Sequence, residues 1–330
     1  MRLLVTGGAG YIGSHVTRQL VEAGHQVVVL DNLSTGFRQA VLGVELVVGD
    51  LADVDLLDGL FAKHGFDAAL HFAAFIVVPE SVEEPIKYFR NNTQNVLNLL
   101  EVGARHRLGK MVFSSTAAVY GEPDCAGGLI SEAQPLNPIN PYGASKMMSE
   151  RMIQDVAAAT DLDCVILRYF NVAGADPGGR IGQSTPNATH LIKVAAQAAL
   201  GMRSQLQVFG TDYATPDGTC VRDYIHVEDL AAAHLAALDH LNAGGGSEVL
   251  NCGYGHGLSV REVVETMRTV SGVNFPVLEV PRRAGDPPAL VADNARILAT
   301  LDWRPRYDDI ETIVASALKW ETQLRDGVWS

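Results

Sequence analysis

The sequence predicts an α/β protein: a doubly wound parallel sheet followed by a smaller mixed α/β C-terminal domain. Short apolar runs alternate with segments of helical apolar spacing, a pattern that implies a parallel sheet with helices on both faces. Small or polar residues follow several of these runs, at the sheet edge where such folds bind ligands. The predicted strands are residues 1–5, 26–30, 45–48, 68–71, 110–114 and 164–169.

The first strand leads directly into a glycine-rich turn. Glycines 7, 10 and 13 fall in the run Thr6-Gly-Gly-Ala-Gly-Tyr-Ile-Gly-Ser14, between the strand and a helix whose apolar pattern continues to Gly24. Such glycines allow a tight turn, close approach of a pyrophosphate and close helix packing, and the free amides of the helix start bind phosphate. The second strand ends at Asp31, and an acid there can hold ribose hydroxyls and repel a 2′-phosphate. These residues predict a dinucleotide site that favours NAD over NADP.

The strand and helix alternation ends at a turn-rich loop, residues 174–182. We therefore predict one domain over residues 1–175 and a second over 176–330, with a segment near 224–250 that returns to the first. In the second domain we expect a helix over about 188–200, strands near Leu206 and Val221, and a helix over about 229–241.

Composition and charge narrow the class of protein. The 330 residues are 47% hydrophobic, enough for a large core, and carry a net charge of −13, which argues against nucleic acid or an anionic membrane as a partner. A strand that starts at residue 1 leaves no room for a leader peptide, so we expect a cytoplasmic protein. The cysteines, at 125, 164, 220 and 252, are widely spaced, which favours buried thiols and predicts no metal site.

Tyr142 and Lys146 are the candidate catalytic pair, because residues four apart share one helix face. A phenol with a pKa of roughly 10 becomes a base near neutrality only with about 4 kcal/mol of favourable charge interaction, and a nearby ammonium supplies part of it. The strand that ends Ser114-Ser115-Thr116 brings hydroxyls beside this helix. Together with a dinucleotide, these groups predict an alcohol-oxidising site in which Thr116 or Ser115 contacts the reacting oxygen.

Several segments together resemble the extended short-chain dehydrogenase/reductase family, most closely its NAD-dependent UDP-glucose 4-epimerases. They are TGGAGYIG, FSSTAAVYG, PYGASK, RYFN, GTCVRDYIHVEDL at 218–230 and PRRAGDPPA at 281–289. The resemblance covers essentially the whole chain and implies a Rossmann-type first domain and a nucleotide-sugar-binding second domain. It also implies NAD as cofactor, a UDP-sugar as substrate, and a homodimer through helices that include residues 92–105 and 147–159.

The resemblance implies roles for individual residues. Tyr142 matches the catalytic base, Lys146 the lysine on the nicotinamide ribose, and Thr116 a substrate-binding hydroxyl. The implied cofactor residues are Gly7, Gly10, Tyr11, Ile12, Gly13, Asp31, Asn32, Ser34, Thr35, Asp50, Leu51, Phe72, Ala73, Ala74, Asn91, Ser114, Tyr142, Lys146, Tyr169 and Phe170. The implied substrate residues are Ser115, Thr116, Tyr142, Asn171, His190, Leu191, Arg222, Arg283 and Asp286.

Three positions depart from the family pattern. Ile76 stands where one branch has a lysine near the cofactor phosphates, and His190 where many members have an asparagine facing the uridine diphosphate. Leu290 occupies the gate beside the sugar 2-substituent, where large residues restrict the site and small ones admit N-acetyl sugars. Leucine is intermediate and leaves N-acetyl acceptance open.

The predicted reaction is interconversion of UDP-glucose and UDP-galactose through a 4-ketone that rotates in the site. A 4,6-dehydratase is a rival, but its family has an Asp-Glu pair where this chain has Ala117-Ala118. A UDP-N-acetylglucosamine 4-epimerase and a UDP-glucuronate epimerase or decarboxylase remain alternatives. A non-catalytic NAD sensor would keep the glycine loop, yet it has no need of Tyr142 and Lys146.

Overall fold

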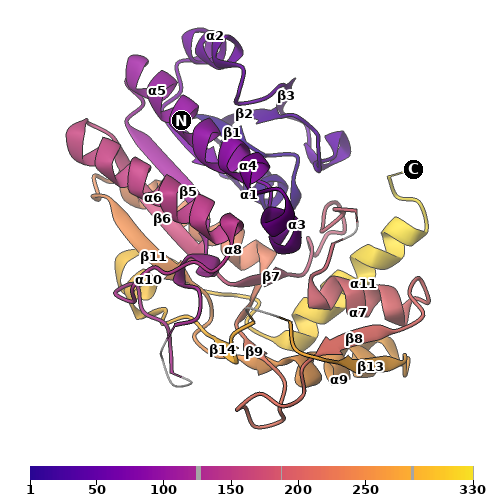
Figure 1. Ribbon diagram of the computed structural model, residues 1–330. Helices are drawn as coiled ribbons and strands as arrows, with labels where there is room; N and C mark the ends of the chain where they lie inside the picture. Colours follow the sequence, from indigo (N-terminus) through magenta and orange to yellow (C-terminus); the bar gives the residue numbers. More distant parts are fainter. Residues whose placement is uncertain (124–127, 187, 284–285, 330) are drawn as a thin grey trace.

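A seven-stranded parallel sheet forms the centre of the computed structural model, which describes residues 1–123, 128–186, 188–283 and 286–329 (Figure 1). The strand order is β11-β6-β5-β4-β1-β2-β3. The bounds are β1 Arg2–Thr6, β2 Gln26–Asp31, β3 Glu45–Val48, β4 Ala68–His71, β5 Lys110–Thr116, β6 Asp163–Tyr169 and β11 Glu248–Cys252. The predicted doubly wound, Rossmann-type fold is confirmed, and β5 runs two residues past its predicted end.

Helices cover both faces of the sheet because alternate strand residues point to opposite sides. Leu3 and Val5 join a core with α1 (Tyr11–Glu22) and α8 (Val227–Asn242), whereas Leu4 joins a core on the other face. That second face is covered by α2 (Val54–His64), α5 (Asn95–Arg105) and α6 (Pro141–Ala159). Figure 1 shows α5 and α6 side by side along one flank of the sheet.

A short irregular segment connects β4 to α5. It contains α3 (Val78–Glu83), α4 (Pro85–Tyr88) and a turn of π-helix, η2 (Phe89–Gln94). Within the described ranges, 3-10 turns lie at η1 (Arg38–Ala40) and η3 (Ala117–Tyr120). Because the π-turn takes residues 89–94, α5 begins at Asn95 rather than at the predicted residue 92.

The second half of the chain builds small sheets and three packed helices, which lie together at one end of the molecule in Figure 1. The helices are α7 (Leu191–Ala199), α9 (Val260–Ser271) and α11 (Ile310–Arg325); α10 (Ala295–Thr300) is shorter. Helix α7 starts later than predicted because His190 is extended, with φ −68° and ψ 131°. The paired strands are β7 (Asn171–Ala173) with β10 (Tyr224–His226), β8 (Leu206–Phe209) with β13 (Val277–Val280), and β9 (Val221–Arg222) between β12 (Leu258–Ser259) and β14 (Ala289–Leu290).

The chain crosses between the two halves more than once, since α8 and β11 return to the central sheet. The core that contains Leu3 and Val5 also contains Ile192, Trp303 and Ile313, so one continuous apolar cluster joins the halves. The division at residues 175 and 176 stays a prediction.

Within the described residues, no helix has the length and apolar character that crossing a membrane requires. Cys164, Cys220 and Cys252 are buried free thiols, as predicted, and Cys125 lies outside the described residues.

Candidate active site

The glycine loop between β1 and α1 leaves no room for side chains. Gly7 has φ +73°, in the left-handed region, and a Cβ there would lie 2.5 Å from the amide nitrogen of Ala73, which follows β4. A Cβ on Gly13 would lie 2.2 Å from the carbonyl oxygen of Gly7. Gly10 caps α1 without a side-chain hydrogen bond, so the first amides of the helix face the loop uncapped. This cradle of bare backbone fits a pyrophosphate.

Asp31 ties the glycine loop to the end of β2. Its carboxylate accepts hydrogen bonds from the amides of Ala9 at 2.9 Å and Leu33 at 2.8 Å, and its side chain is buried. Burial raises the pKa of this carboxyl, and the two amide hydrogen bonds oppose that rise. Each carboxylate oxygen keeps a second lone pair for a ligand hydroxyl.

The polar residues predicted around the adenosine lie next to Asp31. Asn32 donates to Asp50 at 2.7 Å and accepts from the amide of Ser34 at 3.0 Å. Ser34 and Thr35 are exposed, whereas Leu51 is buried at the start of the turn that leads to α2. The structure therefore brings this group of predicted cofactor residues together at one end of the cradle.

Tyr142 and Lys146 lie in the first turns of α6, which begins with Pro141 and is capped by Asn140 accepting from the amide of Gly143 at 2.9 Å. Both side chains are buried. The Lys146 ammonium donates to the carbonyl oxygen of Ser114 at 2.9 Å. Burial lowers the pKa of Lys146 to about 7, and the negative charge of Glu150 opposes the decrease.

The environment of the Tyr142 phenol corrects one expectation. Burial raises its pKa above the ordinary value, and a hydrogen bond with the hydroxyl of Thr116 opposes that rise. The expectation that Lys146 lowers this pKa is not borne out in the protein alone, where burial has the largest effect on the phenol. The phenol does lie beside Thr116, so the predicted pair of reacting-oxygen contacts is assembled.

Ser115 does not join that pair. Its hydroxyl donates to the carboxylate of Glu150, and both side chains are buried between β5 and α6. Neighbouring strand residues point to opposite faces, so Ser115 turns away from the side of β5 that carries Ser114. The prediction of Ser115 as a contact to the reacting oxygen is therefore corrected.

Residues at the ends of β4 and β6 form another side of the predicted cofactor site. Phe72, Ala73 and Ala74 follow β4 and are half-buried. Tyr169 at the end of β6 receives a hydrogen bond from the Ser114 hydroxyl at 3.2 Å, and Phe170 is buried after it. These residues surround the same strand edge as the predicted catalytic pair.

Two further contacts complete this end of the cradle. The Tyr11 phenol, in the first turn of α1 just before Ile12, donates to the carbonyl oxygen of Gly174 at 2.6 Å. Asn91 donates to the side chain of Asn92 at 2.9 Å.

Asn92 is a residue that the sequence reading missed. Its side chain donates to the carbonyl oxygen of Phe75 and accepts from the Phe75 amide, both at 2.9 Å, and so fixes the chain that follows Ala74. The signal available in the sequence was a second asparagine directly after Asn91.

The predicted substrate residues come from the second half of the chain. Arg222 donates to the carbonyl oxygen of Pro287 at 2.9 Å and lies 3.6 Å from the carboxylate of Asp286. Arg283 is exposed and its guanidinium lies 3.6 Å from the centre of the Phe209 ring. Asp286 also donates its amide to the Arg283 carbonyl at 3.4 Å, so it contacts both arginines.

The remaining predicted contacts come from several elements of the fold. Asn171 opens β7 and donates its amide to the carbonyl oxygen of Asp223, next to Arg222. His190 precedes Leu191 at the start of α7 and accepts from the Gln183 side chain at 2.9 Å. Leu290 pairs with Arg222 in β14, and Ile76 is 44% exposed.

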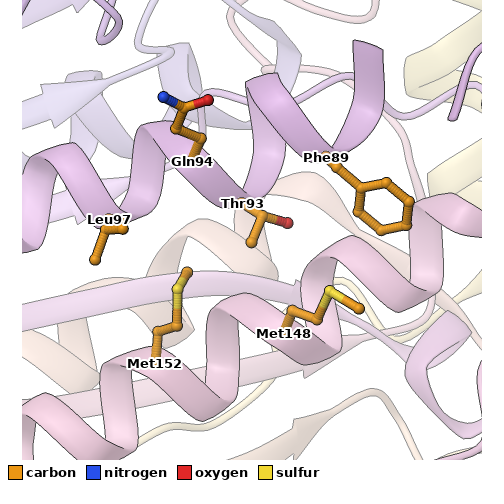
Figure 2. A pocket seen from close by; sticks show the side chains of 6 residues that line it. All are labelled: Phe89, Thr93, Gln94, Leu97, Met148 and Met152. Carbon is orange, nitrogen blue, oxygen red and sulfur yellow. The ribbon is translucent and has the colours of Figure 1, made fainter. Parts of the chain in front are cut away.

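An apolar hollow lies on the outer flank of α5 and α6, apart from this site (Figure 2). Its volume is about 340 Å³, and Leu97 and Met148 in its lining are 47% and 44% exposed. We call this surface the α5–α6 face, and its lining residues are Phe89, Thr93, Gln94, Leu97, Met148 and Met152.

Comparison with known proteins places this chain among enzymes. Residues 3–253 match the model of the NAD dependent epimerase/dehydratase family. A UDP-glucose 4-epimerase from Azospirillum brasilense is 58% identical over 328 residues, which cover 99% of this chain and 94% of the relative.

Two solved structures share the fold over nearly the whole chain. The UDP-glucose 4-epimerase from Brucella ovis in complex with NAD has 45% identity and a TM-score of 0.93, over 97% of this chain and 98% of that one. The enzyme from Bifidobacterium longum in complex with NAD⁺ and UDP has 38% identity and a TM-score of 0.93, over 99% and 100% of the two chains.

Proposed function

The chain belongs to the NAD dependent epimerase/dehydratase family, and from this premise we propose that it interconverts UDP-glucose and UDP-galactose by epimerisation at C4. One observation carries the chemistry: Tyr142 lies against Thr116 while Lys146, one helical turn later, is held by the Ser114 carbonyl. A phenol and a hydroxyl thus meet at one point beside the cradle, where a secondary alcohol can be deprotonated.

The glycine loop and Asp31 at the end of β2 would hold NAD, with the pyrophosphate at the start of α1 and the adenosine ribose at Asp31. When bound, NAD supplies reversible acceptance of the hydrogen on C4 of the sugar. Lys146 would contact the nicotinamide ribose, and Phe72, Ala73, Tyr169 and Phe170 would enclose that end and exclude water.

Tyr142 would take the proton of the C4 hydroxyl and later return it, while Thr116 holds the same oxygen by a hydrogen bond. The resulting 4-ketone must rotate within the site before it is reduced on its other face. Arg222 and Arg283 would hold the diphosphate, since guanidinium groups pair well with phosphate oxygens. Further contacts to the nucleotide would come from Asn171, His190, Leu191 and Asp286. The sugar would remain free to rotate.

Elimination of the 6-hydroxyl is disfavoured at this site. After Thr116 the chain forms η3 with Ala117 and Ala118, which carry no acid. A 4,6-dehydratase needs a proton donor and acceptor there, so an epimerase is the better reading.

Substitution of the phenol tests this function. In Tyr142→Phe, conversion of UDP-galactose to UDP-glucose should fall at least ~10²-fold, because general acid–base catalysis contributes roughly 10²–10⁴-fold. Tyr307→Phe is the matched control: its ring stacks on His226, away from the catalytic pair, and its activity should match the wild type. Unchanged conversion in Tyr142→Phe would refute the role of the phenol.

We also propose that the protein is a homodimer through the α5–α6 face and that it acts in the cytoplasm. The exposed Leu97 and Met148 support the dimer, since large apolar groups gathered around one hollow are typical of interfaces. Met148→Glu should convert the dimer to monomer in analytical ultracentrifugation, whereas Met202→Glu, at a similarly exposed methionine elsewhere, should not. A monomeric wild-type protein would contradict the proposal.

A further inference from the structure

Three side chains of α6 contact the last residues of β5 at regular spacing. Tyr142, Lys146 and Glu150 are four residues apart and therefore share one helix face. The Tyr142 phenol lies close to the Thr116 hydroxyl, Lys146 donates to the carbonyl of Ser114, and Glu150 accepts from the hydroxyl of Ser115. The third contact is the only one of these three without a role in the reaction proposed above.

Glu150 is held more firmly than the other two. It is 1% exposed, and Arg168 of β6 donates to both of its carboxylate oxygens, with Nη2 at 2.6 Å and Nε at 3.0 and 3.1 Å. Ser115 and Arg168 are partners in the register of β5 and β6. One carboxylate of the helix is therefore bound by two adjacent strands at once.

The network continues beyond the ion pair. Arg168 donates to the phenol of Tyr120 at 3.0 Å, and Tyr120 donates to Asn251 of β11 at 2.7 Å. Asn251 in turn donates to the carbonyl oxygen of Ile130 at 2.7 Å. A buried ion pair of this kind contributes little net stability compared with apolar packing, so stability alone is a poor explanation for it.

We propose that Glu150, locked by Arg168, is a positioning residue that sets where Tyr142 and Lys146 lie against Thr116 and Ser114, and that its negative charge favours the charged form of Lys146. The inference rests on the catalytic roles proposed for Tyr142 and Lys146. Movement of α6 along β5 would displace the phenol and the ammonium together, and displacement by about 1 Å can cost on the order of 10²-fold in rate.

The charged and titratable groups around Lys146 support the inference that Glu150 favours the charged form of this lysine. Tyr142 and Glu150 lie one turn before and one turn after Lys146 on α6, and His71 on β4 interacts with it electrostatically. Arg168 on β6 binds Glu150, and Tyr169 on β6 interacts with Tyr142. Burial lowers the pKa of His71 to about 3, so this imidazole is neutral. Burial also raises the pKa of Tyr169, which keeps that phenol neutral. Glu150 is the one carboxylate among these five, and Arg168 moderates its charge.

The test is Glu150→Gln, measured as kcat and KM for UDP-galactose across pH 5–10, with rates expressed per NAD-loaded site. The affinity of the apoprotein for NAD is measured in parallel by calorimetry. We expect kcat to fall at least ~10-fold with KM nearly unchanged, and NAD affinity to fall because Lys146 is displaced. Loss of the carboxylate also lowers the pKa of Lys146, so the alkaline limb of the kcat profile should move to lower pH.

Two further variants keep the result interpretable. Glu150→Asp keeps the carboxylate on a side chain that is one methylene group shorter. It should lower kcat without moving the alkaline limb of the pH profile. It also tests the positioning role if Glu150→Gln does not fold. Asp155→Asn is the control, because Asp155 forms an exposed pair with Arg151 on the same helix. That variant should match the wild type.

The outcomes distinguish failure of the positioning role of Glu150 from failure of the proposed epimerase function. Wild-type kcat, pH profile and NAD affinity in a folded Glu150→Gln or Glu150→Asp protein would overturn the positioning role alone. An inactive wild-type protein that binds NAD would overturn the proposed epimerase function, and the positioning role with it.

Discussion

Asp31→Asn tests how one carboxylate serves both the fold and the cofactor site. In the protein the carboxylate accepts from two amides, the buried one of Ala9 and the half-buried one of Leu33. An asparagine side chain has only one acceptor oxygen, so its NH₂ group must face one of these amides. The buried donor left without a partner costs ~1–3 kcal/mol. The free energy of unfolding of the apoprotein should fall by about this amount.

The same substitution should weaken NAD binding. Ala9 belongs to the glycine loop, and its carbonyl accepts from the amide of Phe37. Loss of the contact between Ala9 and Asp31 therefore loosens both the glycine loop and the segment around Phe37. A hydrogen bond from a ribose hydroxyl to a charged acceptor is worth ~1.5–3 kcal/mol, which corresponds to a roughly tenfold or greater rise in Kd. Binding of NADP should suffer less, because the negative charge that repels a 2′-phosphate is removed.

Urea unfolding of the apoprotein and calorimetric titration with NAD and NADP measure these effects. Asp163→Asn is the matched control, since it removes the same charge from an exposed position at the opposite end of β6. If Asp31→Asn leaves both the unfolding free energy and the NAD affinity at wild-type values, the reasoning is refuted.

Three other predictions concern the substrate side and the pH dependence. Arg283→Met should weaken UDP binding about tenfold, ~1.4 kcal/mol, and reduce its salt dependence, as measured by titration with UDP at two ionic strengths. Leu290→Ser should raise kcat/KM for UDP-N-acetylglucosamine while Leu290→Tyr lowers it, and equal values in both variants would contradict the gate. Burial lowers the pKa of His226 and of His234 to about 4, so the folded state binds fewer protons than the unfolded state between about 4 and 6.5. The free energy of unfolding should therefore decrease as the pH falls through this range, and a flat pH dependence in urea unfolding would contradict it.

Much of the fold was predictable because its signals are local. Alternating strands and helices, three glycines in one turn and an acid after the second strand can each be read within a short window. The return of β11 to the sheet is different. It pairs with β6, more than eighty residues earlier, and only tertiary packing decides that pairing.

The site shows the same division between local and long-range signals. Tyr142 and Lys146 were found by helical spacing, and Thr116 by its place at a strand end. The orientation of Ser115 depends on strand alternation relative to α6, which the motif alone does not contain. Glu150 was missed because the role proposed for it depends on Arg168, which lies on strand β6 and is distant in the sequence pattern. The pKa of Tyr142 was misjudged because burial raises it, and helical spacing carries no information on burial.

The hydrogen on C4 of the sugar provides the most direct test of the central claim. We would convert UDP-galactose to UDP-glucose in deuterium oxide and examine C4 of the product by NMR and mass spectrometry. Internal oxidation and reduction at one site returns the same hydrogen, so the product should carry ordinary hydrogen at C4. Deuterium at C4 would contradict this mechanism, since it would mean that the carbon exchanges its hydrogen with solvent.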